Sequence, residues 1–289
     1  MIKGTNMEDI SMKTVLITGG TDGIGKGLVL HYLQEGCRVF AISSSTEKGK
    51  TLVAEANNLG KGNLTFIQAN LSLVEENLRV VKSISQQTEV LDVLVLCAAS
   101  LKPQPSYIKT PEGFEFTFAL YYLSRYILCH QLKGLLEKAG DHTILNVAAP
   151  GMTGKVNWDD IQMMHNYNGQ NAQFHGSRLN DLLGASFCNS NKIKFILFNP
   201  MAARTNGATK MGAGNAFMKF TMKLYYKLLG KEVNEIVAII NKVVANTKTF
   251  GLSAYKLNKP VDVNMETFDK ANAKKLHLET AALLQKCMD

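Results

Sequence analysis

The sequence predicts an α/β fold in which a doubly wound parallel sheet of about seven strands carries helices on both faces. Short runs of β-branched and aliphatic residues alternate with longer amphipathic stretches from residue 14 to residue 199. Strands separated by helices pair in parallel, and a parallel sheet needs cover on both faces. The chain has 289 residues, of which 46% are hydrophobic and 19% charged, a composition that suits one large α/β domain.

The first part of the chain repeats a strand followed by a helix. Each predicted strand is a short apolar run, and each predicted helix has apolar residues on one face. The predicted strands are 14–18, 38–43, 64–69 and 92–97, and the helices between them are 25–36, 47–60 and 74–84.

The second part begins with a long helix predicted from Pro111, a proline suited to the first helical turn, to residue 138. A strand at 143–148, a helix at 177–187 and a strand at 194–199 follow. We assign 1–12 as an N-terminal extension and 13–289 as a single domain.

Within this domain, 206–231 is expected to form a substrate lid. A long insertion after a late strand lies over the carboxyl edge of the sheet, where ligands bind. Lysines recur there every fourth residue, at 219, 223, 227 and 231, and mark one helix face. This face is either a solvated stripe or a contact with an acidic ligand or membrane surface.

Composition excludes several functions. The net charge is +8, but the basic residues are scattered and form no nucleic-acid motif. The five cysteines are far apart and lack metal-ligand spacing, and His165 with Asp159 and Asp160 has no defined ligand geometry. We therefore expect no metal site and a reduced, cytoplasmic location. No apolar run has membrane-spanning length, so the expected partner is a small-molecule substrate.

A glycine-rich turn follows the first strand, in the sequence TGGTDGIGKG. Gly19 allows a sharp exit from the strand, Gly23 lets the backbone approach a pyrophosphate, and Gly25 allows close packing of helix and strand. The following helix begins with free N–H groups and a positive dipole. These features predict a Rossmann-type dinucleotide site.

The chain resembles the short-chain dehydrogenases/reductases, in particular the branch with retinol-dehydrogenase-type members. The turn matches the family signature Thr-Gly-x-x-x-Gly-x-Gly, and further matches follow in order: Asn70-Leu71, LDVLVLCAAS at 91–100 and NPMAART at 199–205. EGFEFTFALYYLSRYIL and GKVNWDDIQ resemble that branch. The resemblance implies hydride transfer at a nicotinamide. It also implies a homo-dimer or tetramer, with subunit contacts through the long helix after Pro111 and the helix after Ser177.

Carried onto this chain, the resemblance and the glycine turn give a set of expected cofactor-binding residues. They are Thr18, Gly19, Thr21, Asp22, Gly23, Ile24, Gly25, Ser43, Ser44, Ser45, Asn70, Leu71, Cys97, Ala98, Ala99, Arg178, Pro200 and Thr205.

The preferred cofactor is NADP over NAD. No carboxylate follows the second strand to accept from a ribose 2′-hydroxyl. Ser43, Ser44 and Ser45, a helix N-terminus and Lys48 can hold a 2′-phosphate, although Ser44 replaces the Arg that NADP-specific relatives often carry. Alternatively, the serines only cap the helix.

The chain departs from the family at its catalytic residues. The family uses an Asn, a Ser, and a Tyr followed four residues later by a Lys. The corresponding positions here are Tyr121, Ala149, Phe174 and Arg178. A positioned general acid contributes about 10²- to 10⁴-fold in rate, so the usual mechanism is disfavoured. Arg178 keeps a charge that can hold ribose hydroxyls or a phosphate.

Three residues are candidate replacements. Tyr121 is the first candidate for a relocated phenol donor, although a tyrosine on an apolar helix is often only packed. His175 is expected at the rim of the site or in a surface or capping position. Cys97 is expected to be a small buried filler, because nothing in the sequence supplies a base or cation for a thiolate.

Three functions remain open. The first is an atypical NAD(P)(H)-dependent oxidoreductase acting on a small or medium organic substrate. The second is a non-redox enzyme on the same scaffold. The third is a catalytically silent NADP-binding protein that reports cofactor state to a partner.

Overall fold

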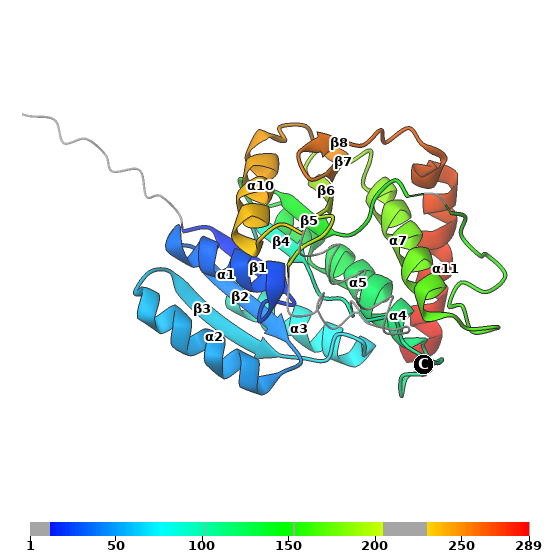
Figure 1. The fold of residues 1–289 in the computed structure, drawn as a ribbon, viewed down its shortest axis with the longest axis horizontal. Coiled ribbons are helices and arrows are strands. Elements are labelled where there is room, and N and C mark those ends of the chain that lie inside the picture. The colour runs from blue at the N-terminus through cyan, green and yellow to red at the C-terminus, as the bar shows by residue number, and fades with distance from the viewer. Residues whose placement is uncertain (1–11, 101, 153, 205–229, 289) are drawn as a thin grey trace, which may run out of the picture.

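The computed structural model describes residues 12–100, 102–152, 154–204 and 230–288. These residues form an eight-stranded sheet in the order β3-β2-β1-β4-β5-β6-β7-β8 (Figure 1). The strands are β1 (Thr14–Thr18), β2 (Arg38–Ser43), β3 (Asn63–Gln68), β4 (Val93–Leu96), β5 (Thr143–Val147), β6 (Lys194–Asn199), β7 (Gly251–Lys256) and β8 (Lys259–Pro260). Every pairing is parallel except the one between β7 and β8. The predicted doubly wound parallel sheet is confirmed, with the two-residue β8 as an additional edge.

Helices cover both faces of the sheet because the side chains of each strand alternate between them. In β1, Val15 and Ile17 pack into one cluster while Leu16 packs into the other. The first cluster lies under α1 (Gly23–Gln34), α2 (Thr46–Leu59) and α10 (Val233–Asn246). The second lies under α3 (Val74–Gln87), α5 (Ser124–Gln131) and α7 (Gly169–Ser186). Both clusters contain strand residues that are fully buried.

The long helix predicted from Pro111 begins later and is not regular. A turn with Gly113 at φ +95° precedes it, and the Glu115 carboxylate accepts a hydrogen bond of 2.6 Å from Phe118 N, which caps the first turn. The helical segment consists of α4 (Phe116–Phe118), a π-helical turn η1 (Ala119–Leu123), α5 and α6 (Lys133–Leu136). Proline propensity therefore placed the start too early.

The C-terminal elements α10, β7 and α11 (Lys270–Met288), with the short η2 (Glu266–Phe268), were not predicted from the sequence. Helix α11 runs beside α7 (Figure 1). The Tyr122 hydroxyl lies 2.7 Å from Thr280 Oγ1, and the Tyr126 hydroxyl lies 2.9 Å from His277 Nδ1. Helix α11 thus packs on α5 and α7, the helices where the family resemblance places subunit contacts, so a contact through this face would involve α11.

Two assigned segments fall largely outside the described residues: the extension 1–12, except Met12, and the lid 206–231, except its last two residues. The chain on either side of 205–229 is held together, because Arg204 N donates to Lys231 O and Lys231 N donates to Ala202 O, each over 2.9 Å. No helix among the described residues has the length and hydropathy needed to cross a bilayer.

Candidate active site

A cleft of about 1080 Å³ opens at the carboxyl ends of β1, β2, β4, β5 and β6. One end is lined by Ser43, the last residue of β2, and by Asn70, which follows β3, and the other end by Tyr121 and Ser177. The glycine turn after β1 lies between these ends in the order of the sheet. Parallel sheets bind ligands at this edge, where the strand order reverses on either side of β1.

The glycine turn is built by close backbone contacts. Gly19 has φ +66°, and a Cβ on it would lie 3.0 Å from Ala98 N. A Cβ on Gly25 would lie 2.3 Å from Gly19 O, a distance that no side chain can occupy. Thr18 Oγ1 accepts hydrogen bonds of 3.1 Å from Cys97 N and Ala98 N. Thr18 therefore ties the ends of β1 and β4 together and does not itself line the cleft.

The N-terminus of α1 faces the cleft. Thr21, Asp22, Gly23 and Ile24 all line it, and Gly23 has φ +50°. The Asp22 carboxylate accepts from Gly23 N over 2.8 Å and forms an ion pair with Lys48. A helix N-terminus that begins with a glycine fits a diphosphate, and the Lys48 ammonium balances the Asp22 carboxylate. The residues present therefore fit a dinucleotide.

The serines after β2 play two parts. The Thr21 hydroxyl donates to Ser43 Oγ over 2.7 Å, and Ser45 Oγ accepts from Lys48 N at the start of α2. Ser44 is exposed and lines the cleft. Ser45 therefore caps α2, which was the alternative role of these serines. All three serines nevertheless line the cleft, so their hydroxyls are available to a 2′-phosphate.

Most of the remaining predicted cofactor residues are at the cleft, but Arg178 does not line it. The lining includes Asn70, Leu71, Cys97, Ala98, Ala99 and Pro200, whereas Thr205 lies outside the described residues. Burial raises the pKa of the Cys97 thiol to about 12, so Cys97 stays protonated at neutral pH. This agrees with its expected role as a filler.

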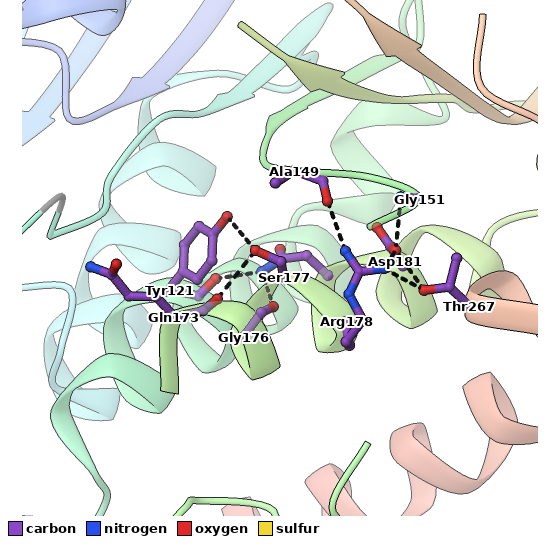
Figure 2. Close-up of polar contacts among 10 residues, drawn as sticks. Tyr121, Ala149, Gly151, Gln173, Gly176, Ser177, Arg178, Asp181 and Thr267 are labelled. Carbon is purple, nitrogen blue, oxygen red and sulfur yellow. Dashed lines mark hydrogen bonds and ion pairs between the residues drawn. The ribbon is translucent and has the colours of Figure 1, made fainter. Parts of the chain in front are cut away.

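Tyr121 and Ser177 meet at the far end of the cleft (Figure 2). The two hydroxyl oxygens lie 3.3 Å apart. Ser177 Oγ also lies 3.2 Å from Gln173 O, to which it donates. With the serine proton used in that bond, the Tyr121 phenol is the donor to Ser177 Oγ. The phenol predicted as a relocated donor is thus at the cleft, with a hydroxyl partner that the sequence interpretation did not identify.

A buried polar network holds the Tyr121 backbone. Tyr121 belongs to the π-helical turn η1, and such turns are frequent at functional sites. Asn180 Nδ2 donates to Tyr121 O and to Gly176 O, each over 2.8 Å, and Asn146 Nδ2 donates to Asn180 Oδ1 over 2.9 Å. A Cβ on Gly176 would lie 2.7 Å from Tyr121 Cδ1. Gly176 therefore lets the ring approach α7.

Phe174 and Arg178, the two predicted site residues on α7 that were assigned to the Tyr and Lys positions, point in different directions. Phe174 is 54% exposed and lines the cleft together with Ala149. Arg178 is 3% exposed, does not line the cleft, and points away from Tyr121 (Figure 2). The structure does not bring Arg178 to the cofactor cleft, contrary to our expectation.

An acidic partner explains the position of Arg178. Its guanidinium pairs with the Asp181 carboxylate and donates to Thr267 Oγ1 over 2.6 Å and to Ala149 O over 2.7 Å. Asp181 also accepts from Gly151 N over 3.2 Å. The ion pair with Asp181, together with these hydrogen bonds, holds the guanidinium on the side of α7 that faces away from Tyr121. Asp181 lies one turn after Arg178, and its effect was missed from the sequence.

Comparison with protein families matches residues 13–161 to the short chain dehydrogenase family. The chain belongs to this family. It is 26% identical to human retinol dehydrogenase 11 over 206 residues, which is 71% of this chain and 60% of that protein. It is 28% identical to an oxidoreductase of Emericella nidulans over 172 residues, which is 58% of this chain and 51% of the relative. The chain thus spans about half to three-fifths of the length of these relatives.

Solved structures of short-chain dehydrogenases share the fold. The structure from Streptomyces avermitilis aligns with a TM-score of 0.63 at 18% identity, covering 96% of this chain and 97% of that chain. The structure from Sphingobium yanoikuyae, in complex with NADPH, aligns with a TM-score of 0.60 at 16% identity, covering 83% of this chain and 87% of that chain.

His175 is buried and is neither at the rim of the cleft nor at the surface, contrary to our expectation. The residue is 7% exposed, and its Nε2 accepts a hydrogen bond of 3.0 Å from Asn157 N. Burial lowers the pKa of His175 to about 4, so the ring is neutral near pH 7. His175 and Phe174 are neighbours on α7 and therefore face different directions. Phe174 is exposed, whereas His175 points into the protein and binds the backbone at Asn157.

Arg125 is a further residue that sequence analysis missed. It lies within an apolar helical run. A charged residue in such a run is the sequence feature that could have identified it. Its guanidinium carbon lies 4.5 Å from the centre of the Tyr121 ring.

Among the described residues, no group of three or more His, Cys, Asp or Glu side chains is placed to bind a metal ion.

His175 predicts a pH dependence of stability. Its folded pKa of about 4 lies below its usual 6.5, so the unfolded chain binds a proton more readily between these values. The stabilising effect of a neutral His175 is present above pH 6.5 and is lost as the pH falls toward 4, by about 3 kcal/mol in total. His175→Gln keeps an acceptor for Asn157 N but cannot titrate.

Denaturant unfolding of both proteins at pH 7.5 and pH 4.5 checks this. The wild type should lose about 2 kcal/mol more than His175→Gln on acidification. Parallel losses in the two proteins would contradict the assignment of a buried, neutral imidazole.

Proposed function

We propose that the protein is an NADP(H)-dependent oxidoreductase in which the proton donor has moved from α7 to Tyr121. The observation that carries this proposal is the Tyr121–Ser177 hydroxyl pair, 3.3 Å apart, at the end of a cleft whose middle fits a diphosphate. The family membership and NADP-bound structures of similar fold support it.

The chain's own groups can perform the proton-transfer half of a carbonyl reduction. NADPH supplies the hydride when it is bound. Tyr121 Oη donates its proton to the substrate oxygen, and the phenolate that results is stabilised by the Ser177 hydroxyl, which can rotate from Gln173 O to donate to it. Asn180 and Gly176 fix the position of Tyr121 through its backbone and ring. Such positioning is what makes a general acid effective.

The preference for NADP over NAD is part of the proposal. The end of β2 presents serine hydroxyls at the cleft, with no carboxylate at Ser43, Ser44 or Ser45 to repel a 2′-phosphate. The N-terminus of α2 adds positive potential there, and Lys48 balances the Asp22 carboxylate, which also lines the cleft. The NADP complexes among structures of similar fold agree with this preference.

The substrate we propose is an apolar alcohol or carbonyl compound. Phe116, Leu120, Met152 and Phe174 line the cleft beside Tyr121, and this surface favours an apolar molecule. Several relatives are named retinol dehydrogenases. A retinoid aldehyde, all-trans-retinal, is therefore a suitable first test substrate, together with smaller apolar ketones and enones.

A second candidate function follows from Arg178. Asp181 keeps this cation out of the cleft, so α7 supplies no positive charge to the cofactor side. This favours, as an alternative, a silent NADP-binding protein that binds the nucleotide without turning substrate over. NADPH binding without NADPH consumption across the substrate panel would support this alternative against the oxidoreductase.

Gly25→Ala tests the dinucleotide cleft. The added Cβ would lie 2.3 Å from Gly19 O. This overlap would force the glycine turn away from α1, and overpacking of this kind is destabilising. We expect the Kd for NADPH to rise at least about tenfold, measured by calorimetry. Gly134→Ala is the matched control, because a Cβ there meets nothing within 4 Å. Equal NADPH affinity in the Gly25 variant would show that the nucleotide binds elsewhere.

Tyr121→Phe tests the proton donor. We expect kcat for the best carbonyl substrate to fall by about 10²-fold or more, with the Kd for NADPH unchanged, because only the acid is removed. Ser177→Ala should give a smaller loss. Tyr122→Phe is the control, since the Tyr122 hydroxyl bonds to Thr280 away from the cleft. Full activity in Tyr121→Phe would exclude this donor.

A further inference from the structure

Arg125 is a buried cation without an acidic partner in the described part of the chain. It follows Tyr121 by one helical turn and is 1% exposed. Nη1 donates to Asn146 Oδ1 and, over 2.9 Å, to Val147 O, while Nη2 donates to Ala98 O over 3.1 Å. All these acceptors are neutral. Nε has no hydrogen-bond partner among the described residues.

The charge on Arg125 is not cancelled by its surroundings. The ionisable groups that face it are Tyr121, Cys97 and Cys129, and burial raises the pKa of both thiols, so they are neutral. Burial lowers the pKa of Arg125 itself, but a guanidinium remains protonated in proteins. Arg178, which is also buried, differs because Asp181 neutralises it. An unpaired buried charge destabilises a protein, so its presence beside a cleft indicates a function.

The guanidinium lies one residue layer below the cleft. Ala98 and Val147, whose carbonyl oxygens accept its hydrogen bonds, both line the cleft, as does Tyr121, whose ring centre is 4.5 Å from the guanidinium carbon. This is the end at the carboxyl termini of β4 and β5. A dinucleotide with its diphosphate at the glycine turn and its adenosine toward β2 directs its nicotinamide to this end.

We propose that Arg125 gives the cleft a preference for the reduced cofactor. This inference rests on the proposed NADP(H) function. Oxidised nicotinamide carries a positive charge and reduced nicotinamide is neutral, so a fixed cation beneath this end repels only the oxidised ring. Unit charges ~10 Å apart, at an effective dielectric constant of about 20, repel strongly enough to change an affinity by roughly tenfold. The cofactor phosphates are common to both forms and cancel in the comparison.

Calorimetric titration of the full chain with NADPH and with NADP⁺ tests this. The wild type should bind NADPH about tenfold or more tightly than NADP⁺. Arg125→Lys keeps the charge and should keep most of this ratio. Arg125→Met removes the charge, and the ratio should fall by about tenfold. Asn146→Asp places a carboxylate at the oxygen that already accepts from Arg125. It should reduce the ratio with the guanidinium still in place, which provides the test if Arg125→Met does not fold.

The outcomes are distinct. A ratio that falls in Asn146→Asp or Arg125→Met and persists in Arg125→Lys supports the proposal. A ratio that is the same in all variants overturns it while leaving NADP(H) binding intact. Failure of the wild type to bind either nucleotide overturns both this proposal and the proposed function.

Discussion

The backbone contact between Gly25 and Gly19 is the constraint on which the rest of the site depends. It holds the first turn of α1 against the end of β1, at a distance that admits no Cβ. Thr18 then fixes the end of β4 to the same point through Cys97 N and Ala98 N. Because β2 and β3 lie on one side of β1 and β4, β5 and β6 on the other, the cleft extends from this junction to both sides. The proposed nucleotide site therefore depends on the backbone at this junction and not on the side chains at the other end of the cleft.

Two buried arginines, Arg125 and Arg178, lie near the end of the cleft that contains Tyr121, and they differ in their partners. Arg178 is paired with Asp181 and does not line the cleft. The hydrogen bonds that Arg125 makes within the described part of the chain all go to neutral oxygens next to the cleft. Of these two arginines, the one close to the cleft follows Tyr121 on the same helical segment. Asn146 and Asn180 join these parts, since one accepts from Arg125 and the other donates to Tyr121 O. The side-chain amides of Asn146 and Asn180 both have hydrogen-bond partners, and buried polar groups that are satisfied in this way are rigid.

The sequence predicted the parts of the fold that follow from periodicity. The strands of the first repeats and the glycine turn were placed correctly, because alternating burial and close backbone contacts leave clear residue patterns. The start at Pro111 was wrong, because Gly113 and the Glu115 cap override proline propensity. Arg178 and His175 could not be oriented from the sequence. Their directions depend on Asp181 and Asn157, contacts made only once α7 and the preceding loop are in place.

The central claim is that this cleft binds a dinucleotide and favours the 2′-phosphorylated form. Calorimetric titration of the wild-type chain with NADPH and, separately, with NADH measures it most directly. The account predicts saturable binding of NADPH with 1:1 stoichiometry and weaker binding of NADH, because hydroxyls and positive potential surround the end of β2. Absence of heat and of association for both nucleotides would contradict it.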